Sequence, residues 1–373
     1  MPKQRASTQT THLEALLKEY YEKRISSIPE PQALERREFG FGFLDGNFTR
    51  HLAFSSSEDY FRFLQNKHPK DVYYSTALYQ VPKEEMHKKG WLGAELVFDL
   101  DAEQVLRTGD DNIKNGWITI ESYEEIKRRF FSLIEDFIES DFGLSEGEYS
   151  LGFSGGRGYH LRITRADYMS LDQRARREVT EYVVLGFRPD MTQKGELIAP
   201  FPNDFGWSKK IYDWIIDHGS RSLSDLGSLQ KVSATRLINK MRRIKYPSKL
   251  VLTQIERGAF EVLSKMAVES VTISVDERVT VDINRLLRAP GTVHGGSGLV
   301  AKKISKSELE RFMPFDDAEM GLNSVASIVV DRVPFAISIG GETVDPSDSG
   351  RLIEINSNLA YYLVIRGGAH FYA

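Results

Sequence analysis

The 373-residue sequence contains no cysteine. Disulfides are therefore excluded, and so are metal sites that need thiolates, such as cysteine zinc knuckles and iron–sulfur clusters. Runs of about 18 uncharged residues, as a membrane helix requires, are also missing, and Met1–Arg24 mixes charges throughout without an apolar core. We therefore expect a soluble, cytoplasmic protein with no membrane partner.

The sequence also lacks an overall excess of positive charge, since its formal net charge is −4. Binding of a nucleic acid would therefore need a local basic patch. One segment qualifies: Gly206–Leu250 carries ten Lys or Arg against three Asp, a local charge of +7. Two interpretations stay open for it: contact with the phosphates of a template strand, or a helical surface that faces solvent or docks a protein.

The hydrophobic patterning predicts a mixed α/β (α+β) fold. Strand patterns occur at Glu95–Asp101 and at Tyr149–Phe153, whereas the region after the proline-bearing stretch Pro189–Pro202 is almost entirely helical. We therefore expect a mixed-sheet domain made of residues 1–203 and 270–373, with an all-helical subdomain inserted at 204–269. In the tail, strand-like runs are expected at Ser327–Val330 and Leu359–Ile365.

Asp99 and Asp101 end the clearest predicted strand. Side chains two residues apart on a strand point to the same face, with about 6–7 Å between their Cα atoms. Two carboxylates so placed repel each other unless a hard cation or a basic side chain compensates them. The pair therefore favours a divalent metal site; the alternative is a strand that simply ends in solvent, where acids are common.

The segment Ser154-Gly155-Gly156-Arg157-Gly158-Tyr159-His160 separates two predicted strands. Its glycines allow backbone amides to approach an anion, and its Arg and His supply donors for a phosphate. It is not a Walker loop, because no Gly-Lys-Ser/Thr follows, and it is not a dinucleotide fingerprint, because the spacing of its glycines differs. The alternative is a hairpin turn with an exposed Arg157 and a His160 packed in the core.

A third block runs from Asp276 to His294. We expect Asp276 to end a strand over Val271–Val275 and to join the metal site. Asp282 is expected to cap a short helix that carries Arg285 and Arg288, with His294 in the turn beyond Pro290-Gly291. For Arg285, a position on the solvated face of this helix is the favoured interpretation.

In their order and separations, these three blocks resemble the small, catalytic subunit of archaeal and eukaryotic-type DNA primase. The resemblance extends over roughly Arg37 to Leu299. It implies a primase–polymerase fold with a helical insertion, and a nucleotidyltransferase that makes short primers from nucleoside triphosphates on single-stranded DNA. It also implies a large, regulatory primase subunit as the partner in a heterodimer, within the primosome of an archaeal-type cell.

The resemblance further implies roles for particular residues. Asp99, Asp101 and Asp276 would be the catalytic carboxylates that hold two Mg²⁺ or Mn²⁺ ions. The phosphates of the nucleotide would be bound by Ser154, Gly155, Arg157, His160, Arg288 and His294. Most members of the family carry a Cys/His zinc knuckle after the paired aspartates, but Ala102–Glu121 contains neither residue type, so we expect no zinc knuckle.

Other functional classes share parts of this pattern. A primase-like repair polymerase of end joining uses a similar metal centre on existing DNA ends. A glycosyltransferase can hold a metal–sugar nucleotide with Asp-x-Asp, although the block from Arg288 to His294 then has no role. A catalytically inactive nucleic-acid-binding subunit would not need all three acids.

Overall fold

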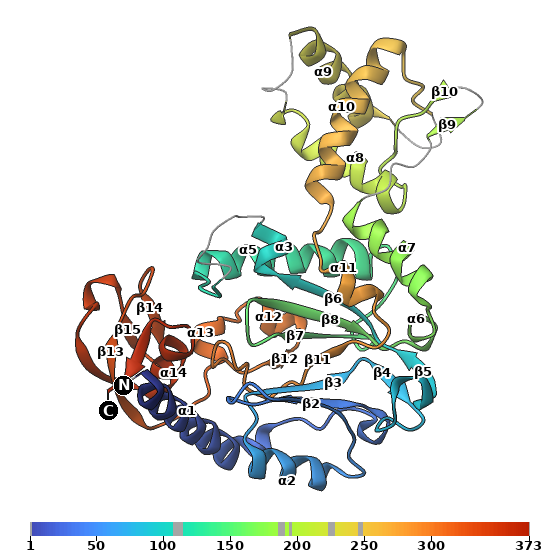
Figure 1. Ribbon diagram of the computed structural model, residues 1–373. Helices are drawn as coiled ribbons and strands as arrows, with labels where there is room; N and C mark the ends of the chain where they lie inside the picture. Colours follow the sequence, from blue (N-terminus) through green and yellow to red (C-terminus); the bar gives the residue numbers. More distant parts are fainter. Residues whose placement is uncertain are drawn as a thin grey trace. The chain divides into compact units, whose positions relative to one another are not determined.

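The computed structural model describes residues 2–106, 115–185, 191–193, 196–222, 228–244 and 249–372 (Figure 1). They form two compact units. The first unit comprises Met1–Phe130, Ser145–Arg177 and Val275–Ala373, and the second comprises Phe131–Leu144 and Glu178–Ser274. The second unit therefore takes in more of the chain than the segment 204–269 expected from the sequence. None of the helices in the described part of the chain is long and apolar enough to cross a membrane.

The centre of the first unit is a four-stranded sheet of order β12–β7–β8–β6. Its strands are β6 (Leu96–Asp101), β7 (Tyr149–Phe153), β8 (Gly158–Ile163) and β12 (Lys302–Ile304). Helix α5 (Ile120–Ser132) covers one face, where the Phe130 ring stacks on Tyr159 at a centroid distance of 5.3 Å. The opposite face carries the polar side chains of the candidate site.

A second four-stranded sheet has the order β11–β3–β1–β2. It consists of β1 (Phe39–Gly42), β2 (Phe48–Leu52), β3 (Asp71–Ser75) and β11 (Leu286–Arg288). Aromatic rings from β1 and from helix α2 (Ser57–Lys67) pack together beneath it, with Phe41 and Phe63 at 4.5 Å. All strand pairs in these two sheets are antiparallel, which confirms the α+β class and makes both sheets antiparallel rather than mixed.

The C-terminal part of the first unit is a small three-stranded sheet, β16–β13–β17, packed against helix α14. The elements are β13 (Val325–Val330), β16 (Leu352–Asn356), α14 (Ser357–Ile365) and β17 (Ala369–Phe371). The strand expected at Leu359–Ile365 is wrong: the Asn356 side chain caps a helix there by accepting a hydrogen bond from the Leu359 amide. Residues 357–363 are all buried, so no polar face marks the helical period in the sequence.

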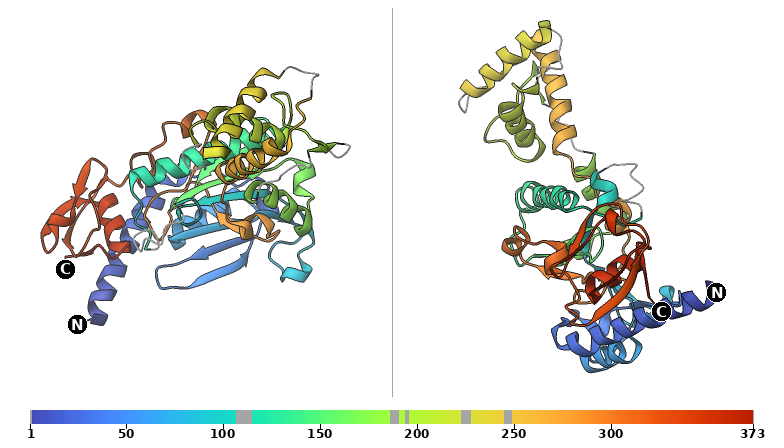
Figure 2. Two further views of the ribbon diagram at one scale, coloured as in Figure 1. Left: turned by 90° about the horizontal axis from the view of Figure 1, so that it is seen from above. Right: turned by 90° about the vertical axis from the view of Figure 1, so that its left-hand side faces the viewer.

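The N-terminal helix α1 (Pro2–Arg24) lies beside this C-terminal sheet, as both views of Figure 2 show. Gln9 Nε2 donates to the Phe371 carbonyl at 3.1 Å, so the two ends of the described chain are joined.

The other elements of the first unit are short: 3₁₀ helices Ile25–Ser27, Leu34–Arg36, Met86–Lys88 and Pro346–Asp348; strands β4 (Ala77–Tyr79), β5 (Trp91–Ala94), β14 (Ile337–Ile339) and β15 (Glu342–Val344); and helices α3 (Ala102–Leu106), α6 (Ala166–Met169), α11 (Glu277–Val281), α12 (Lys306–Leu309) and α13 (Pro314–Asp317).

The second unit is mainly helical. It contains a π-helical segment (Leu133–Glu139), most of α7 (Gln173–Val184), α8 (Gly206–His218), α9 (Ser228–Arg243), α10 (Gln254–Val271) and a two-stranded hairpin of β9 (Thr192–Gln193) and β10 (Glu196–Leu197). A capping box of Thr253 and Glu256 starts α10. Because α10 continues to Val271, the strand expected over Val271–Val275 is wrong.

Candidate active site

The two aspartates of β6 lie on the open face of the central sheet. Asp99 pairs in register with His160 of β8, and Asp101 pairs with Gly158. Directly opposed residues of an antiparallel pair share a face. Accordingly, Asp99 Oδ1 lies 3.3 Å from His160 Nε2.

Asp101 is held by two neighbours. Its Oδ1 accepts a hydrogen bond from the Glu103 amide at 3.0 Å, and its Oδ2 lies 3.3 Å from Arg157 Nε. Burial raises the pKa of Asp101, and the charge of Asp99 adds to this increase, while Arg157 opposes it. The acidic pair is therefore partly desolvated and mutually repelling, which are the conditions under which a bound cation is favourable.

Asp276 joins this edge through its backbone. Its amide donates to the Asp99 carbonyl at 2.9 Å, which places the third acidic residue directly beside β6. Its side chain caps helix α11 by accepting from the Arg278 amide at 3.0 Å. The expected cap at Asp282 is wrong, because Asp282 ends α11, and the expected helix carrying Arg285 and Arg288 is replaced by strand β11.

In the described part of the chain, no group of three or more His, Asp or Glu side chains stands ready to hold a metal ion. The carboxylates of Asp101 and Asp276 instead accept the backbone amides named above. The donor set nevertheless fits a hard divalent cation, since the Asp99 and Asp101 carboxylates share one face of β6, the Asp276 backbone lies beside them, and oxygen ligands suit such ions. Part of the segment expected to lack a zinc knuckle, residues 107–114, lies outside the described residues.

Ser154 shapes the turn between β7 and β8. Its Oγ accepts the amides of Gly156 and Gly158 at 3.2 and 3.3 Å, and its own amide donates to the Gly158 carbonyl. Gly155 has a φ of +77°, and a Cβ there would lie 2.9 Å from the Cβ of His294. Glycine at position 155 thus allows the turn between β7 and β8 to pack against the loop that carries His294.

His294 points its Nε2 atom at this turn. The Gly296 amide donates to its Nδ1 at 3.1 Å, so in the neutral ring the proton is on Nε2. A Cβ on Gly156 would lie 2.7 Å from that Nε2. Burial lowers the pKa of His294 well below its ordinary value, and the charges of Arg288 and Arg366 lower it further. His294 is therefore a neutral N–H donor beside the glycine loop.

Arg288 projects from β11 and is nearly buried. Its Nη1 pairs with Asp71 Oδ1 at 2.6 Å and donates to the Val293 carbonyl, while its Nη2 donates to the Tyr73 hydroxyl at 2.8 Å. Asp71 and Tyr73 were not predicted from the sequence as partners of Arg288. Their alternate positions on one strand were the available signal, since both side chains share a face of β3.

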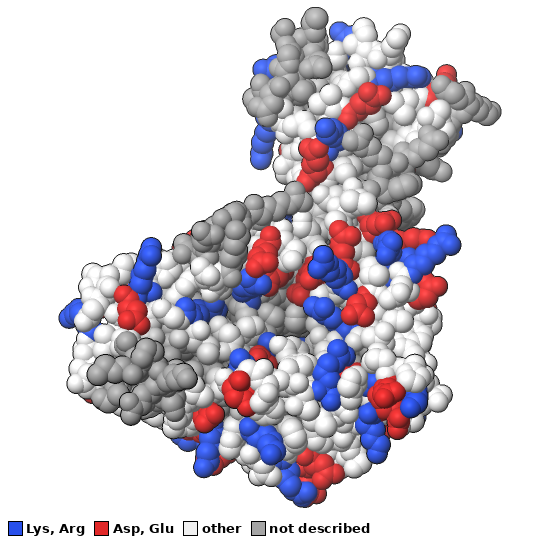
Figure 3. Space-filling view, viewed as in Figure 1, with Lys and Arg blue, Asp and Glu red and all other residues white. Residues whose placement is uncertain are grey.

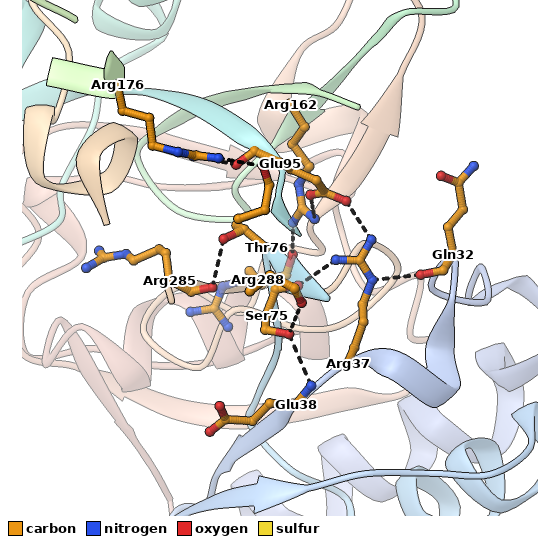
Figure 4. Close-up of polar contacts among 12 residues, drawn as sticks. Gln32, Arg37, Glu38, Ser75, Thr76, Glu95, Arg162, Arg176, Arg285 and Arg288 are labelled. Carbon is orange, nitrogen blue, oxygen red and sulfur yellow. Dashed lines mark hydrogen bonds and ion pairs between the residues drawn. The ribbon is translucent and has the colours of Figure 1, made fainter. Parts of the chain in front are cut away.

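Behind Arg288 lies a buried polar cluster, also missed from the sequence (Figure 4). The Glu95 carboxylate receives Arg37 Nη2 at 2.6 Å and Arg162 Nη1 at 3.3 Å, and all three residues are at most 8% exposed. Arg162 also donates to the Arg288 carbonyl at 3.1 Å. Both guanidinium groups also lie over the Tyr74 ring, at 4.9 and 4.7 Å from its centroid. This cluster holds the strand that carries Arg288.

A cavity of about 630 Å³ adjoins the site, within the size range of pockets that bind small molecules. His160, Arg162, Arg288 and Tyr74 contribute to its wall, together with residues of β7 and β12. Over the molecular face seen in Figure 3, basic and acidic side chains are interspersed, consistent with the absence of a global basic field. The wall of the cavity likewise combines arginine and lysine side chains with the acids Glu30, Glu95, Glu146 and Glu308.

The structure thus brings the predicted site residues together in the first unit. Asp99, Asp101, Arg157 and His160 are in direct contact with one another in pairs. Gly155 packs against His294. Arg288 donates a hydrogen bond to the carbonyl of Val293, the residue before His294. The side chain of Asp276 is turned to its own helix, so only its backbone contacts Asp99.

Comparisons with known proteins agree with this geometry. A family model described as DNA primase small subunit matches residues 98–305. The DNA primase small subunit PriS of Methanosarcina barkeri is 32% identical, over 96% of this chain and 96% of the relative. PriS of Methanosarcina mazei is 30% identical over 98% and 97%, and PriS of Picrophilus torridus is 30% identical over 87% and 91%.

Proposed function

The chain belongs to the DNA primase small subunit family, and from this premise we propose that it makes short primers by template-directed nucleotidyl transfer from nucleoside triphosphates on single-stranded DNA. One observation carries the proposal: paired carboxylates on β6 adjoin a glycine loop at which Arg157, His160 and His294 converge. A polymerase centre requires carboxylate ligands for metal ions beside N–H groups that donate hydrogen bonds to the phosphates of the nucleotide.

We assign Asp99, Asp101 and Asp276 as the ligands of two Mg²⁺ or Mn²⁺ ions. Such ions stabilise charge on the attacking and leaving oxygens of an in-line displacement at phosphorus. The raised pKa of Asp101 supports this assignment, because its desolvation and the nearby Asp99 both disfavour an uncompensated negative charge. Asp276 would give up its bond to the Arg278 amide in order to serve as a ligand.

The triphosphate would be held by the chain's own donors. His294 presents Nε2–H, and Arg157, Arg288 and His160 add charged or polar N–H groups. The Ser154 Oγ accepts two backbone amides, so its hydroxyl proton remains free to donate to a phosphate oxygen. Together with the Gly155 backbone, these groups would orient the triphosphate for attack at its α-phosphorus.

Helix α9 of the second unit is the proposed contact for the template phosphates. Its sixteen residues contain five basic and no acidic side chains. The buried face consists of Ala234, Leu237, Ile238 and Met241, so the basic residues lie on the exposed face. Lys240 pairs with Glu256, whereas Arg236 and Arg243 have no acidic partner among the described residues. The affinity for single-stranded DNA should therefore fall with salt.

The family relationship also supports a large, regulatory primase subunit as partner. Co-expression of this chain with such a subunit from a related archaeon and size-exclusion chromatography tests the proposal. A stable one-to-one complex is expected, and separate elution of the two chains contradicts it.

A primer-free synthesis assay tests the main proposal. The chain is incubated with labelled nucleoside triphosphates and an unprimed single-stranded template, with Mn²⁺ or with a chelator. Short products that require template and disappear with the chelator are expected. Extension of only pre-existing 3′ ends would instead indicate an end-joining polymerase, and turnover of sugar nucleotides alone would indicate a glycosyltransferase.

A further inference from the structure

Arg366 follows helix α14 in the C-terminal part of the first unit and contacts two aromatic rings. Its guanidinium lies 4.5 Å from the centroid of Tyr362 and 5.9 Å from that of Trp117. Its Nη1 packs against Gly116, whose φ of +83° favours glycine and where a Cβ would overlap the guanidinium. At these distances the guanidinium makes cation–π contacts with the two rings, which hold it in place and leave its N–H groups available to an acceptor.

The guanidinium of Arg366 has no hydrogen-bond or ion-pair partner among the described residues, and its Nε is buried without an acceptor. A partly buried charge without a partner is unfavourable. Arg37 and Arg162, which are more fully buried, are both paired with Glu95, whereas the Nε of the half-buried Arg285 also lacks an acceptor in the described part of the chain. The environment of Arg366 is therefore suited to an anion that the chain itself does not supply.

Helix α14 is tied to both loops of the candidate nucleotide site. The Tyr361 ring fills the space beside Gly298, and the Gly298 amide donates to the His294 carbonyl at 2.8 Å. On the other side, Tyr362 packs on Phe315 at 5.6 Å, and Phe315 packs on Tyr123. The Tyr123 hydroxyl in turn donates to the Gly156 carbonyl at 2.7 Å. Arg366 therefore belongs to the wall that supports the glycine loop and His294.

The charge of Arg366 is felt at this site. After burial and Arg288, Arg366 is the next contributor to the lowered pKa of His294, and it also acts on Tyr123. Arg157 and Arg288 have carboxylate partners, Asp101 and Asp71, whereas Arg366 has none in the described chain. An incoming anion would have to displace a carboxylate partner from Arg157 or from Arg288, but not from Arg366.

We propose that Arg366 is a phosphate-binding residue through which the C-terminal part of the chain completes the nucleotide site, with the terminal phosphates of a nucleoside triphosphate as its ligand. This inference rests on the proposed function, because it takes the loops of Ser154 and His294 as the triphosphate site. The terminal phosphates are the expected contact, since they carry most of the negative charge of a nucleoside triphosphate. Trp117 and Tyr362 act as positioning residues that orient the guanidinium.

Equilibrium binding by isothermal titration tests the proposal with the full chain and ATP, ADP and AMP as ligands. Arg366→Gln is expected to weaken ATP binding by about tenfold or more, as loss of a charge-assisted hydrogen bond does, and to leave AMP binding nearly unchanged. Arg366→Lys, which keeps the charge but not the planar fork, should lose less. Arg332→Gln removes an exposed arginine of the same C-terminal part and should bind all three nucleotides as the unaltered chain does.

The outcomes separate the inference from the proposed function. If the unaltered chain does not prefer ATP to AMP, or makes no primers, the proposed function fails. If it does, but Arg366→Gln and Arg366→Lys retain the same ATP-to-AMP preference, the assignment of Arg366 is overturned. Thermal unfolding of each variant is measured alongside. Should Arg366→Gln not fold, Arg366→Lys decides alone, since a purely structural cation would be replaced by lysine without a change in phosphate preference.

Discussion

Arg157 Nε lies 3.3 Å from Asp101 Oδ2, so one guanidinium joins a proposed metal ligand to the proposed phosphate loop. Arg157 also pairs with Glu103 through Nη1. A cation that binds Asp101 would replace Arg157 as its counter-charge and release the guanidinium towards a phosphate. Binding of metal and of nucleotide should therefore be coupled, and by linkage the coupling is reciprocal.

Arg157→Gln should weaken this coupling. In the unaltered chain, we expect Mn²⁺ to increase the affinity for nucleoside triphosphate, by a factor between about 5 and 150. In the variant, nucleotide binds more weakly and Mn²⁺ increases its affinity by a smaller factor. Titration of nucleotide with and without Mn²⁺ measures both quantities, and an unchanged factor would refute the exchange of partners.

Replacement of either strand aspartate should abolish synthesis. Asp99→Asn and Asp101→Asn keep the shape of the side chain but remove the charge that holds a divalent ion. Primer-free synthesis should fall below detection, while circular dichroism and the unfolding temperature stay close to those of the unaltered chain. Glu277→Gln, an exposed acid beside Asp276, is the matched control and should retain synthesis. Near-normal synthesis by both aspartate variants would rule out the metal assignment.

The raised pKa of Asp101 predicts a pH dependence. Metal binding needs the ionised carboxylate, so the affinity for Mn²⁺ is lost as the pH falls through the raised pKa, above the ordinary value of 3.8. The effect on the free energy of unfolding has the opposite sign. Because the folded chain holds the Asp101 proton more tightly than the unfolded chain does, the contribution of Asp101 to this free energy decreases as the pH rises from 3.8 through the raised pKa. Mn²⁺ titrations between about pH 4 and 7 check the first effect. Loss of Mn²⁺ binding only near the ordinary value would contradict it.

Arg288 should mainly affect nucleotide affinity. Arg288→Gln alone leaves Asp71 as an unpaired, nearly buried carboxylate, so the informative variant combines it with Asp71→Asn. We expect the double variant to fold and to show a KM for nucleotide raised by about tenfold or more, because a charge-assisted contact to phosphate is lost. Steady-state kinetics compare it with Asp71→Asn alone. An equal KM in the two variants would remove Arg288 from the phosphate site.

Glu95 should be important for stability rather than for chemistry. Glu95→Gln leaves Arg37 and Arg162 buried without a negative charge, and loss of one partner of a buried ion pair lowers the free energy of unfolding by about 3–5 kcal/mol. Urea denaturation measures the change. Glu146→Gln, an exposed acid on the same cavity wall, should change stability by less than about 0.5 kcal/mol. A loss no larger in Glu95→Gln would show that the cluster is dispensable.

Strands β6, β7 and β8 were predictable because their signal is local. Alternation of polar and apolar residues marks a sheet with one covered face, and the glycine-rich turn interrupts it visibly. Helix α14 was not predictable in the same way. It is buried on all sides, and a short apolar run does not distinguish a helix from a strand.

The sequence itself determined three features: the shared strand face of Asp99 and Asp101, the glycine-rich turn, and the basic charge of the segment that contains α9. Each depends on residues within a few positions of one another. Only the tertiary structure decided that Arg288 pairs with Asp71, 217 residues away, that Asp276 meets β6 through its backbone, and that Arg366 contacts the rings of Trp117 and Tyr362. The physical reason is that the free energy of a charged side chain depends on how it is buried and on which charges face it. Folding sets both, by bringing together chain segments that are far apart in the sequence.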